Sequence, residues 1–366
     1  MIKLFQLDRL WQEIRQDALA DIDAVASQGY AQRGPSVENL EKWLRDYSGR
    51  RNAITVASCT DALRCSLQFL FKDYNNSFIA VPSYTFAATV HAIKNAGCTP
   101  VFIDVDEDYH MRVDTIPAWI NGIVTVDLFG LAQNYDGLRN LGVPVIMDAA
   151  QSIETFDEQG RSSLNQGWAS CTSFAPTKTI PAFGSGGAIL TDDDDFAEWA
   201  RRWRTHGKIT NSDMSVCYGA NSMMSSLEAA QVLCGVQRHL AWRQRREDIA
   251  NIYTASINSR LITAPNTRGV HTWHKYVIRC QDQGVRVRFQ NYMKERGIDT
   301  QLFYNPLVHQ EHIYANDADV FHEPAICDFK LVNSEWLSNR SVGIPCQHTL
   351  TDQEVNIIST ALREYK

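Results

Sequence analysis

The sequence predicts an α/β protein with a large domain, in which helices flank a mostly parallel central sheet, and a smaller α+β C-terminal domain. From about residue 35, short apolar runs alternate with amphipathic helices, which is typical of a sheet buried on both faces. From about residue 265 the pattern changes to β-rich segments mixed with short helices. The 366 residues also exceed the usual size of one hydrophobic core, so we expect a second domain.

Seven apolar runs are the expected strands of the large domain. They lie at residues 53–57, 78–82, 99–105, 122–130, 143–149, 171–175 and 187–192. In sheets of this kind the ligand binds outside the carboxyl ends of the strands. Residues that directly follow a run are therefore the first candidates for a functional site.

Helical periodicity predicts the helices that lie around these runs. An amphipathic N-terminal helix is expected from the spacing of Leu4, Leu7, Leu10, Trp11 and Ile14. A second helix is expected to be capped by Ser36 and ended by Gly49, with an apolar face made of Val37, Leu40, Trp43, Leu44 and Tyr47. Further helices are expected from Asp61, around 87–95, at 192–206 and at 351–364.

The domain organisation is predicted from one long helix. The segment SSLEAAQVLCGVQRHLAWRQRREDIANIYTAS, from about residue 225, is expected to form a continuous helix that links the two domains. We expect the large domain, with the N-terminal helix, over residues 1–240 and the small C-terminal domain over residues 241–366.

Composition excludes several classes of protein. The net charge is −7 without a basic cluster, which argues against nucleic-acid binding. The N-terminus has no apolar signal-peptide region, and no run of 18 apolar residues predicts a membrane span. The nine cysteines form no C-x-x-C pair, so we expect reduced thiols in a cytoplasmic enzyme.

Lys178 is the first candidate for catalysis. It lies in SFAPTKTIPAFGSGGAIL, after an expected buried strand and before a glycine-rich turn at 184–187. Most lysines lie on the surface, but a partly desolvated lysine at a strand end has a lowered pKa and attacks carbonyl carbons. The position therefore favours a lysine that is nucleophilic toward carbonyl carbons, the kind of residue that could hold pyridoxal 5'-phosphate (PLP) as a Schiff base.

Two polar residues near the end of run 143–149 fit the same chemistry. A buried carboxylate at Asp148 could keep the ring nitrogen of PLP protonated. The alternative is that Asp148 caps a helix over the AAQS segment that follows. The amide of Gln151 could bind the phenolic oxygen of PLP, or it could simply be exposed.

A phosphate site and a ring-stacking residue are also expected. The strand-to-helix turn at 58–61 offers free backbone N–H groups, and Thr60 could act as the N-cap there. Ser173, five residues before Lys178, could add its hydroxyl to the same phosphate. Phe86 could stack on the pyridine ring, or it could be a core aromatic residue.

These residues form an ordered pattern that resembles the DegT/DnrJ/StrS family of PLP-dependent sugar aminotransferases, which have fold-type-I architecture. VIMDAAQS resembles the D-A-A-Q motif of the family, and SFAPTKTIPAFGSGGAILTDD resembles its lysine loop. ASCTDAL resembles the phosphate turn. The likeness continues through YGANSMMSSLEAAQ and RGIDTQLFYNPLVHQ to GIPCQHTLTDQEV near the C-terminus.

The resemblance implies a role for each site residue. It implies that Lys178 holds PLP covalently and that Asp148 faces the ring nitrogen, so these two residues are catalytic. Gln151 would face the phenolic oxygen and Phe86 the ring. The cofactor phosphate would be bound by Cys59, Thr60, Ser173 and Asn221, the last from the neighbouring subunit of a homodimer with shared active sites.

The reaction that the resemblance implies belongs to amino-sugar biosynthesis. An amino group would move from L-glutamate (or L-glutamine) to a keto-sugar, usually a nucleotide-linked one. Three alternatives stay open. The chain could act on a non-nucleotide keto-sugar or keto-cyclitol, it could be a PLP-dependent sugar dehydratase, which typically has histidine at the lysine position, or it could be a PLP-binding regulatory protein.

Two departures from the family pattern affect the expected site. Cys59 stands where most members have glycine, so the phosphate turn must avoid positive φ or be strained. Met223 stands where arginine is usual, and it supplies no charge near the substrate. His309 and His312 have an H-x-x-H spacing, but they fall in a family segment without a metal role, so no metal site is expected.

Overall fold

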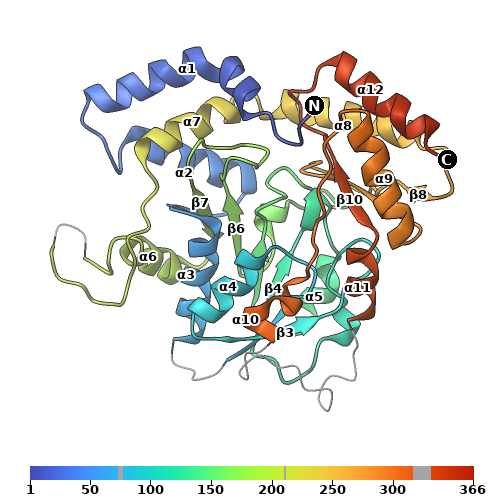
Figure 1. The fold of residues 1–366 in the computed structure, drawn as a ribbon. Coiled ribbons are helices and arrows are strands. Elements are labelled where there is room, and N and C mark those ends of the chain that lie inside the picture. The colour runs from blue at the N-terminus through green and yellow to red at the C-terminus, as the bar shows by residue number, and fades with distance from the viewer. Residues whose placement is uncertain (73–76, 210–211, 316–330) are drawn as a thin grey trace.

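A seven-stranded sheet forms the centre of the computed structural model, which describes residues 1–72, 77–209, 212–315 and 331–366 (Figure 1). Its strands are β1 Asn52–Val56, β2 Phe78–Pro82, β3 Thr99–Ile103, β4 Gly122–Val126, β5 Val145–Asp148, β6 Ala169–Ser173 and β7 Gly187–Thr191. The order is β1-β7-β6-β5-β4-β2-β3; β7 is antiparallel to β1 and β6, and the other pairs are parallel. The expected mostly parallel sheet is confirmed.

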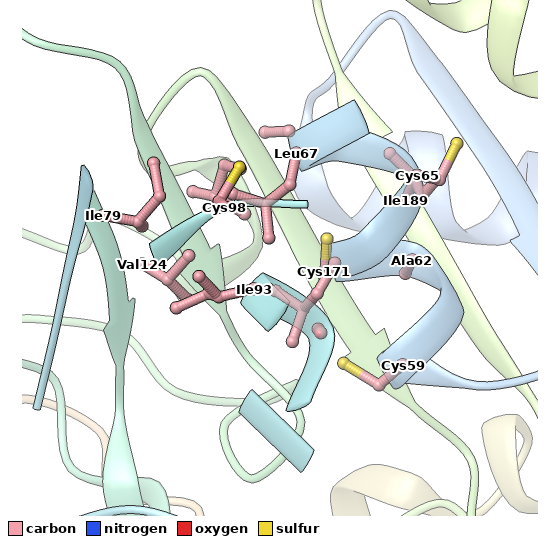
Figure 2. Close-up of a cluster of buried hydrophobic side chains, with 14 of the residues drawn as sticks. Cys59, Ala62, Cys65, Leu67, Ile79, Ile93, Cys98, Val124, Cys171 and Ile189 are labelled. Carbon is pink, nitrogen blue, oxygen red and sulfur yellow. The ribbon is translucent and has the colours of Figure 1, made fainter. Parts of the chain in front are cut away.

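Helices cover both faces of the sheet because alternate strand residues point to opposite sides. The helices α3 Cys59–Phe71, α4 Ala87–Asn95 and α6 Asp194–Trp203 pack on one face, and α2 Pro35–Ser48 and α7 Ser226–Val236 pack on the other. Within β1, Ile54 and Val56 belong to the first core and Ala53 to the second. Figure 2 shows side chains of α3 in the first core, beside Ile79, Val124, Cys171 and Ile189 of the strands.

Several predicted element ends are wrong by a few residues. Strand β4 stops at Val126, because the short 3-10 helix at Leu128–Gly130 takes the rest of the expected run. Gly34, not Ser36, is the N-cap of α2, since Pro35 at the first helical position needs no acceptor for an N–H. Gly49 ends α2 in the left-handed conformation, as expected.

The N-terminal helix packs on the body of the protein. Helix α1 Leu7–Ser27 buries Leu10, Ile14 and Ala18 against Cys234 and Trp242. The expected long linking helix is instead two helices, α7 and α8 His239–Ser256. The break follows Gly235, a poor helix former that lies closely against the Trp242 ring.

The C-terminal part has its own antiparallel sheet and core. The strands β8 Ile262–Thr263, β9 Tyr276–Cys280 and β10 Ser341–Ile344 pair in the order β10-β9-β8. Its helices are α9 Gln283–Glu295, α10 His312–Ala315, α11 Val332–Ser338 and α12 Asp352–Glu364; α5 Tyr135–Arg139 belongs to the central sheet region. Ile2 exchanges backbone hydrogen bonds with Gly297 and Asp299, so the chain start lies against this part.

A buried ionic cluster joins α8 to the segment after β5. Glu154 Oε2 accepts a hydrogen bond from Arg246 Nη2 at 2.5 Å, and Glu154 Oε1 lies 3.1 Å from His239 Nδ1. The Glu154 and Arg246 side chains are both fully buried. Such a cluster fixes α8 against the segment that follows β5.

The cysteines within the described ranges all have free thiols, and Cys327 lies outside those ranges. No helix in the described part of the chain is both long enough and apolar enough to cross a bilayer.

Candidate active site

Strand ends that are far apart in the sequence meet at one edge of the central sheet. The register pairs Gly187, the first residue of antiparallel β7, with Val56 at the end of β1 and with Ser173 at the end of β6. The turn at 58–61, the segment after β2, the end of β5 and the loop at 174–186 therefore converge. They line a cavity of about 480 Å³.

Seven of the predicted site residues line this cavity. They are Cys59, Thr60, Phe86, Asp148, Gln151, Ser173 and Lys178. The eighth, Asn221, is exposed and forms a backbone bridge with Thr205 outside the cavity wall. Met223 does not line the cavity either.

Lys178 is half-buried in the loop between β6 and β7. Burial lowers the pKa of Lys178 below its ordinary value, and the negative charge of Asp148 partly opposes that shift. A lysine with a lowered pKa has a larger neutral fraction, and the neutral amine is the form that attacks carbonyl carbons.

Asp148 is a buried carboxylate, only 5% exposed, at the end of β5. It accepts hydrogen bonds from Thr89 Oγ1 at 2.9 Å and from the Ala150 N–H at 3.1 Å, and the Cys59 thiol lies 3.8 Å away. Burial raises the pKa of Asp148, and these bonds oppose the shift. Because turns and not a helix follow it, the helix-capping alternative is wrong.

Gln151 lies in the cavity wall and is 6% exposed, which excludes simple surface exposure. Its Oε1 accepts a hydrogen bond from the Phe129 N–H at 3.0 Å and lies 3.0 Å from His274 Nδ1. Its Nε2 donates to the Tyr304 hydroxyl at 3.1 Å. The amide is therefore held in one orientation by groups from three separate segments.

The turn at 58–61 has the geometry of an anion site. Ser58, not Thr60, is the N-cap, and its Oγ accepts from the Asp61 N–H at 3.1 Å. The N–H groups of Cys59 and Thr60 have no hydrogen-bond acceptor among the described residues. A helix N-terminus with free N–H groups attracts anions.

Close packing against this turn explains why residue 187, at the start of β7, is a glycine. A Cβ on Gly187 would lie 2.5 Å from the Cys59 nitrogen, so no other residue fits there. Cys59 itself is not among the residues with positive φ, so the turn avoids the strain that its side chain would cause. Ser173 follows the same edge, where its Oγ accepts from the Ala175 N–H at 3.3 Å.

Phe86 is 56% exposed although it lines the cavity. It is the N-cap of α4, and its ring centroid lies 6.1 Å from that of Tyr304. The core-aromatic alternative is therefore wrong. An exposed aromatic ring in the same cavity wall as a buried carboxylate is available to stack on a flat ring.

The cavity wall also contains residues that were not predicted from the sequence, among them Phe5, Thr89, His274, Lys275 and Tyr304. Thr89 lies three residues after Phe86, so helical spacing could have found it. Burial lowers the pKa of His274 well below its ordinary value, which favours a neutral ring beside Gln151. Phe5, Lys275 and Tyr304 come from distant segments that no local pattern connects to Lys178.

The fold and this cavity define an α/β protein in which a lysine with a lowered pKa and a buried carboxylate lie together at the strand ends. The family model described as the DegT/DnrJ/EryC1/StrS aminotransferase family matches residues 12–363. The chain belongs to that family of aminotransferases, which confirms the resemblance and the fold class predicted from the sequence.

Two curated relatives and one solved structure illustrate the likeness. The chain is 27% identical over 375 residues to UDP-2-acetamido-2-deoxy-3-oxo-D-glucuronate aminotransferase of Pseudomonas aeruginosa, with 99% of each chain covered. It is 28% identical to a pleiotropic regulatory protein of Geobacillus stearothermophilus, covering 86% of this chain and 87% of that one. A DegT DnrJ EryC1 StrS aminotransferase from Brucella abortus superposes with a TM-score of 0.91 at 28% identity, over 99% of each chain.

Proposed function

We propose that this chain is a PLP-dependent aminotransferase that transfers the amino group of L-glutamate (or L-glutamine) to a keto-sugar, with nucleotide-linked sugars as the substrate class. The observation that carries the proposal is that Lys178 and Asp148 line the same cavity at the strand ends. A nucleophilic amine and a buried carboxylate are the two groups that PLP chemistry requires of a protein.

The residues present fit PLP. Asp148 is buried without an ion-pair partner among the described residues, so a protonated ring nitrogen would supply the missing positive charge. The free N–H groups of Cys59 and Thr60, with the Ser173 hydroxyl, would hold the phosphate. The exposed Phe86 ring would cover one face of the pyridine, and Gln151 would bind the phenolic oxygen.

Each catalytic residue then has a physical role. PLP, when bound, supplies an electron sink for the negative charge left when the substrate Cα loses its proton. The neutral amine of Lys178 would take that proton as a general base and give it back as a general acid. Asp148 would keep a proton on the ring nitrogen, because its buried charge favours a cation beside it.

The substrate class rests on the relatives rather than on the cavity. The P. aeruginosa relative is named as an aminotransferase of a UDP-linked keto-sugar, which supports a nucleotide-linked keto-sugar here. A non-nucleotide keto-sugar or keto-cyclitol is the alternative within the same reaction, since Met223 supplies no cation to a nucleotide.

Assembly and location form part of the same proposal. We infer a cytoplasmic homodimer in which Asn221 binds the phosphate in the neighbouring subunit. In support of this, Asn221 is exposed on a segment outside its own cavity, and the side chains of Met214, Val216 and Tyr218 before it are exposed and apolar. Apolar side chains gathered on an exposed segment are typical of an interface.

One relative favours a second candidate function. The G. stearothermophilus protein is named for regulation, so a PLP-binding regulatory protein is the alternative class. A regulatory protein would need the cofactor site but no turnover. The sugar dehydratase has no such support, because Lys178 stands where that enzyme typically has histidine.

The test is the half-reaction with L-glutamate alone. The holoenzyme should lose its visible absorption band and release 2-oxoglutarate in stoichiometric amount, and added 2-oxoglutarate should restore the band. Lys178→Ala should show neither change, because no amine remains to move the proton. A persistent band in the wild type would favour the regulatory protein. A keto-sugar product that lost water and gained no nitrogen would favour the dehydratase.

A further inference from the structure

A second lysine lies in the wall of the same cavity. Lys275 directly precedes β9 and is 7% exposed. Its Nζ is buried and has no hydrogen-bond partner, and Lys275 forms no ion pair among the described residues. A buried polar atom without a partner is rare in native structures, and in a functional cavity a bound ligand can supply the missing partner.

Among the described residues, the surroundings of Lys275 offer it aromatic faces but no paired carboxylate. Its Nζ lies 3.9 Å from the centroid of the Phe5 ring and 5.5 Å from that of Phe303. Contact with aromatic ring faces offsets only part of the free energy that it costs to bury an ammonium group. The cavity carboxylate, Asp148, is already bonded to Thr89 and to the backbone at Ala150.

The two lysines of the cavity also influence each other. Burial lowers the pKa of Lys275 well below its ordinary value, and the positive charge of Lys178 lowers it further. Lys275 therefore lies within electrostatic range of the reacting amine. An anion bound beside Lys275 would offset both the cost of burying the ammonium charge and the repulsion between the two lysines.

We propose that Lys275 Nζ binds an anionic oxygen of the substrate, a carboxylate or a phosphate, while Lys178 carries out the chemistry. This inference rests on the proposed function of the cavity. The cofactor phosphate has a separate set of donors at the ends of β1 and β6, whereas Lys275 comes from the C-terminal part together with Phe303. Two sources can supply the anion: the carboxylates of the amino donor or the phosphates of a nucleotide-linked sugar.

The experiment compares the holoenzyme with Lys275→Met, which removes the charge and keeps an unbranched side chain. The first arm measures the apparent Kd for L-glutamate from the concentration dependence of band loss. The second measures binding of UDP and of dTDP by calorimetry. The control is Lys294→Met, the same change at an exposed position of α9. PLP content and Tm of each variant report on cofactor binding and folding.

Lys275→Met should weaken binding about tenfold or more in at least one of the two measurements, because a buried charged contact is lost. Weakening in the L-glutamate arm identifies the donor as the source, and weakening in the UDP or dTDP arm identifies the sugar nucleotide. PLP content should stay at the wild-type level. Wild-type values in both arms would overturn the role of Lys275, and so would a loss of PLP alone. Wild-type enzyme that never loses its band would instead overturn the proposed transamination, leaving the nucleotide arm to decide Lys275.

Discussion

At the residue scale, Asp148 shows how a functional group can oppose stability. The side chain is buried, and the structure surrounds it with hydrogen-bond donors but with no cation that pairs with it among the described residues. Burial raises its pKa in the folded chain. Until a cation arrives at this position, the charged carboxylate costs folding free energy.

The pH dependence of the PLP-free protein should reveal this cost. The folded pKa of Asp148 is above the unfolded value, so its contribution to stability is full below the unfolded pKa, about 4. That contribution is lost as the pH rises through the folded pKa. The free energy of unfolding of the wild type minus that of Asp148→Asn should therefore fall between pH 4 and pH 7, as measured by urea unfolding. A difference that grows with pH would contradict the buried charge.

Residues in the strand-end motifs could be predicted because their position follows from the topology. Lys178, Asp148 and the turn at 58–61 each adjoin an apolar run, and the carboxyl ends of parallel strands meet at one edge. Lys275 and Tyr304 could not be predicted in this way. They reach the cavity from the C-terminal part, through contacts between segments more than a hundred residues apart.

At the element scale, apolar runs located every strand of the central sheet, but helix ends were less well predicted. An apolar run can be recognised from the sequence alone, whereas the position of a helix cap depends on the local φ and ψ angles. Pro35 moves the start of α2, and Ser58 rather than Thr60 is the N-cap of α3. The break between α7 and α8 depends on the packing of Gly235 against Trp242, which helical periodicity does not contain.

The attachment of α8 can be tested through its buried ionic cluster. Glu154→Gln removes the negative charge and leaves the guanidinium of Arg246 buried without a counter-ion. We expect a loss of about 3 to 5 kcal/mol in the free energy of unfolding, as for other broken buried pairs. Guanidinium chloride titration followed by circular dichroism measures it.

The control is the exposed ion pair of Lys42 and Asp46, which lie at i, i+4 spacing on α2. Here too a carboxylate is paired with a cation, but in contact with solvent. Asp46→Asn should change the free energy of unfolding by no more than about 0.5 kcal/mol. Equal effects at Glu154 and Asp46 would mean that the buried cluster does not hold α8.

At the scale of the whole molecule, the site of one chain lacks one predicted group. Asn221 is exposed on the segment between α6 and α7 and does not line the cavity that holds Lys178. We propose that a second chain supplies it. We also propose the domain boundary near residue 240, since the C-terminal part has its own sheet and core.

Hybrid dimers test the shared site. Mixing Asn221→Ala chains with Lys178→Ala chains, each nearly inactive alone, should place both lesions in one site and leave the other intact. Random exchange into two-fold dimers then restores about a quarter of wild-type activity. Native mass spectrometry confirms that exchange has occurred. Full exchange without recovered activity would mean that both groups act within one chain.

The central claim is that Lys178 is the lysine that holds PLP. The measurement that tests it most directly is borohydride reduction of the holoenzyme, followed by peptide mass spectrometry. Lys275, the other lysine of the cavity, serves as an internal comparison. The visible band should disappear, and a pyridoxyl group should be found on the peptide that contains Lys178. A pyridoxyl group on Lys275 or on any other lysine, with Lys178 unmodified, would contradict the assignment of the active site.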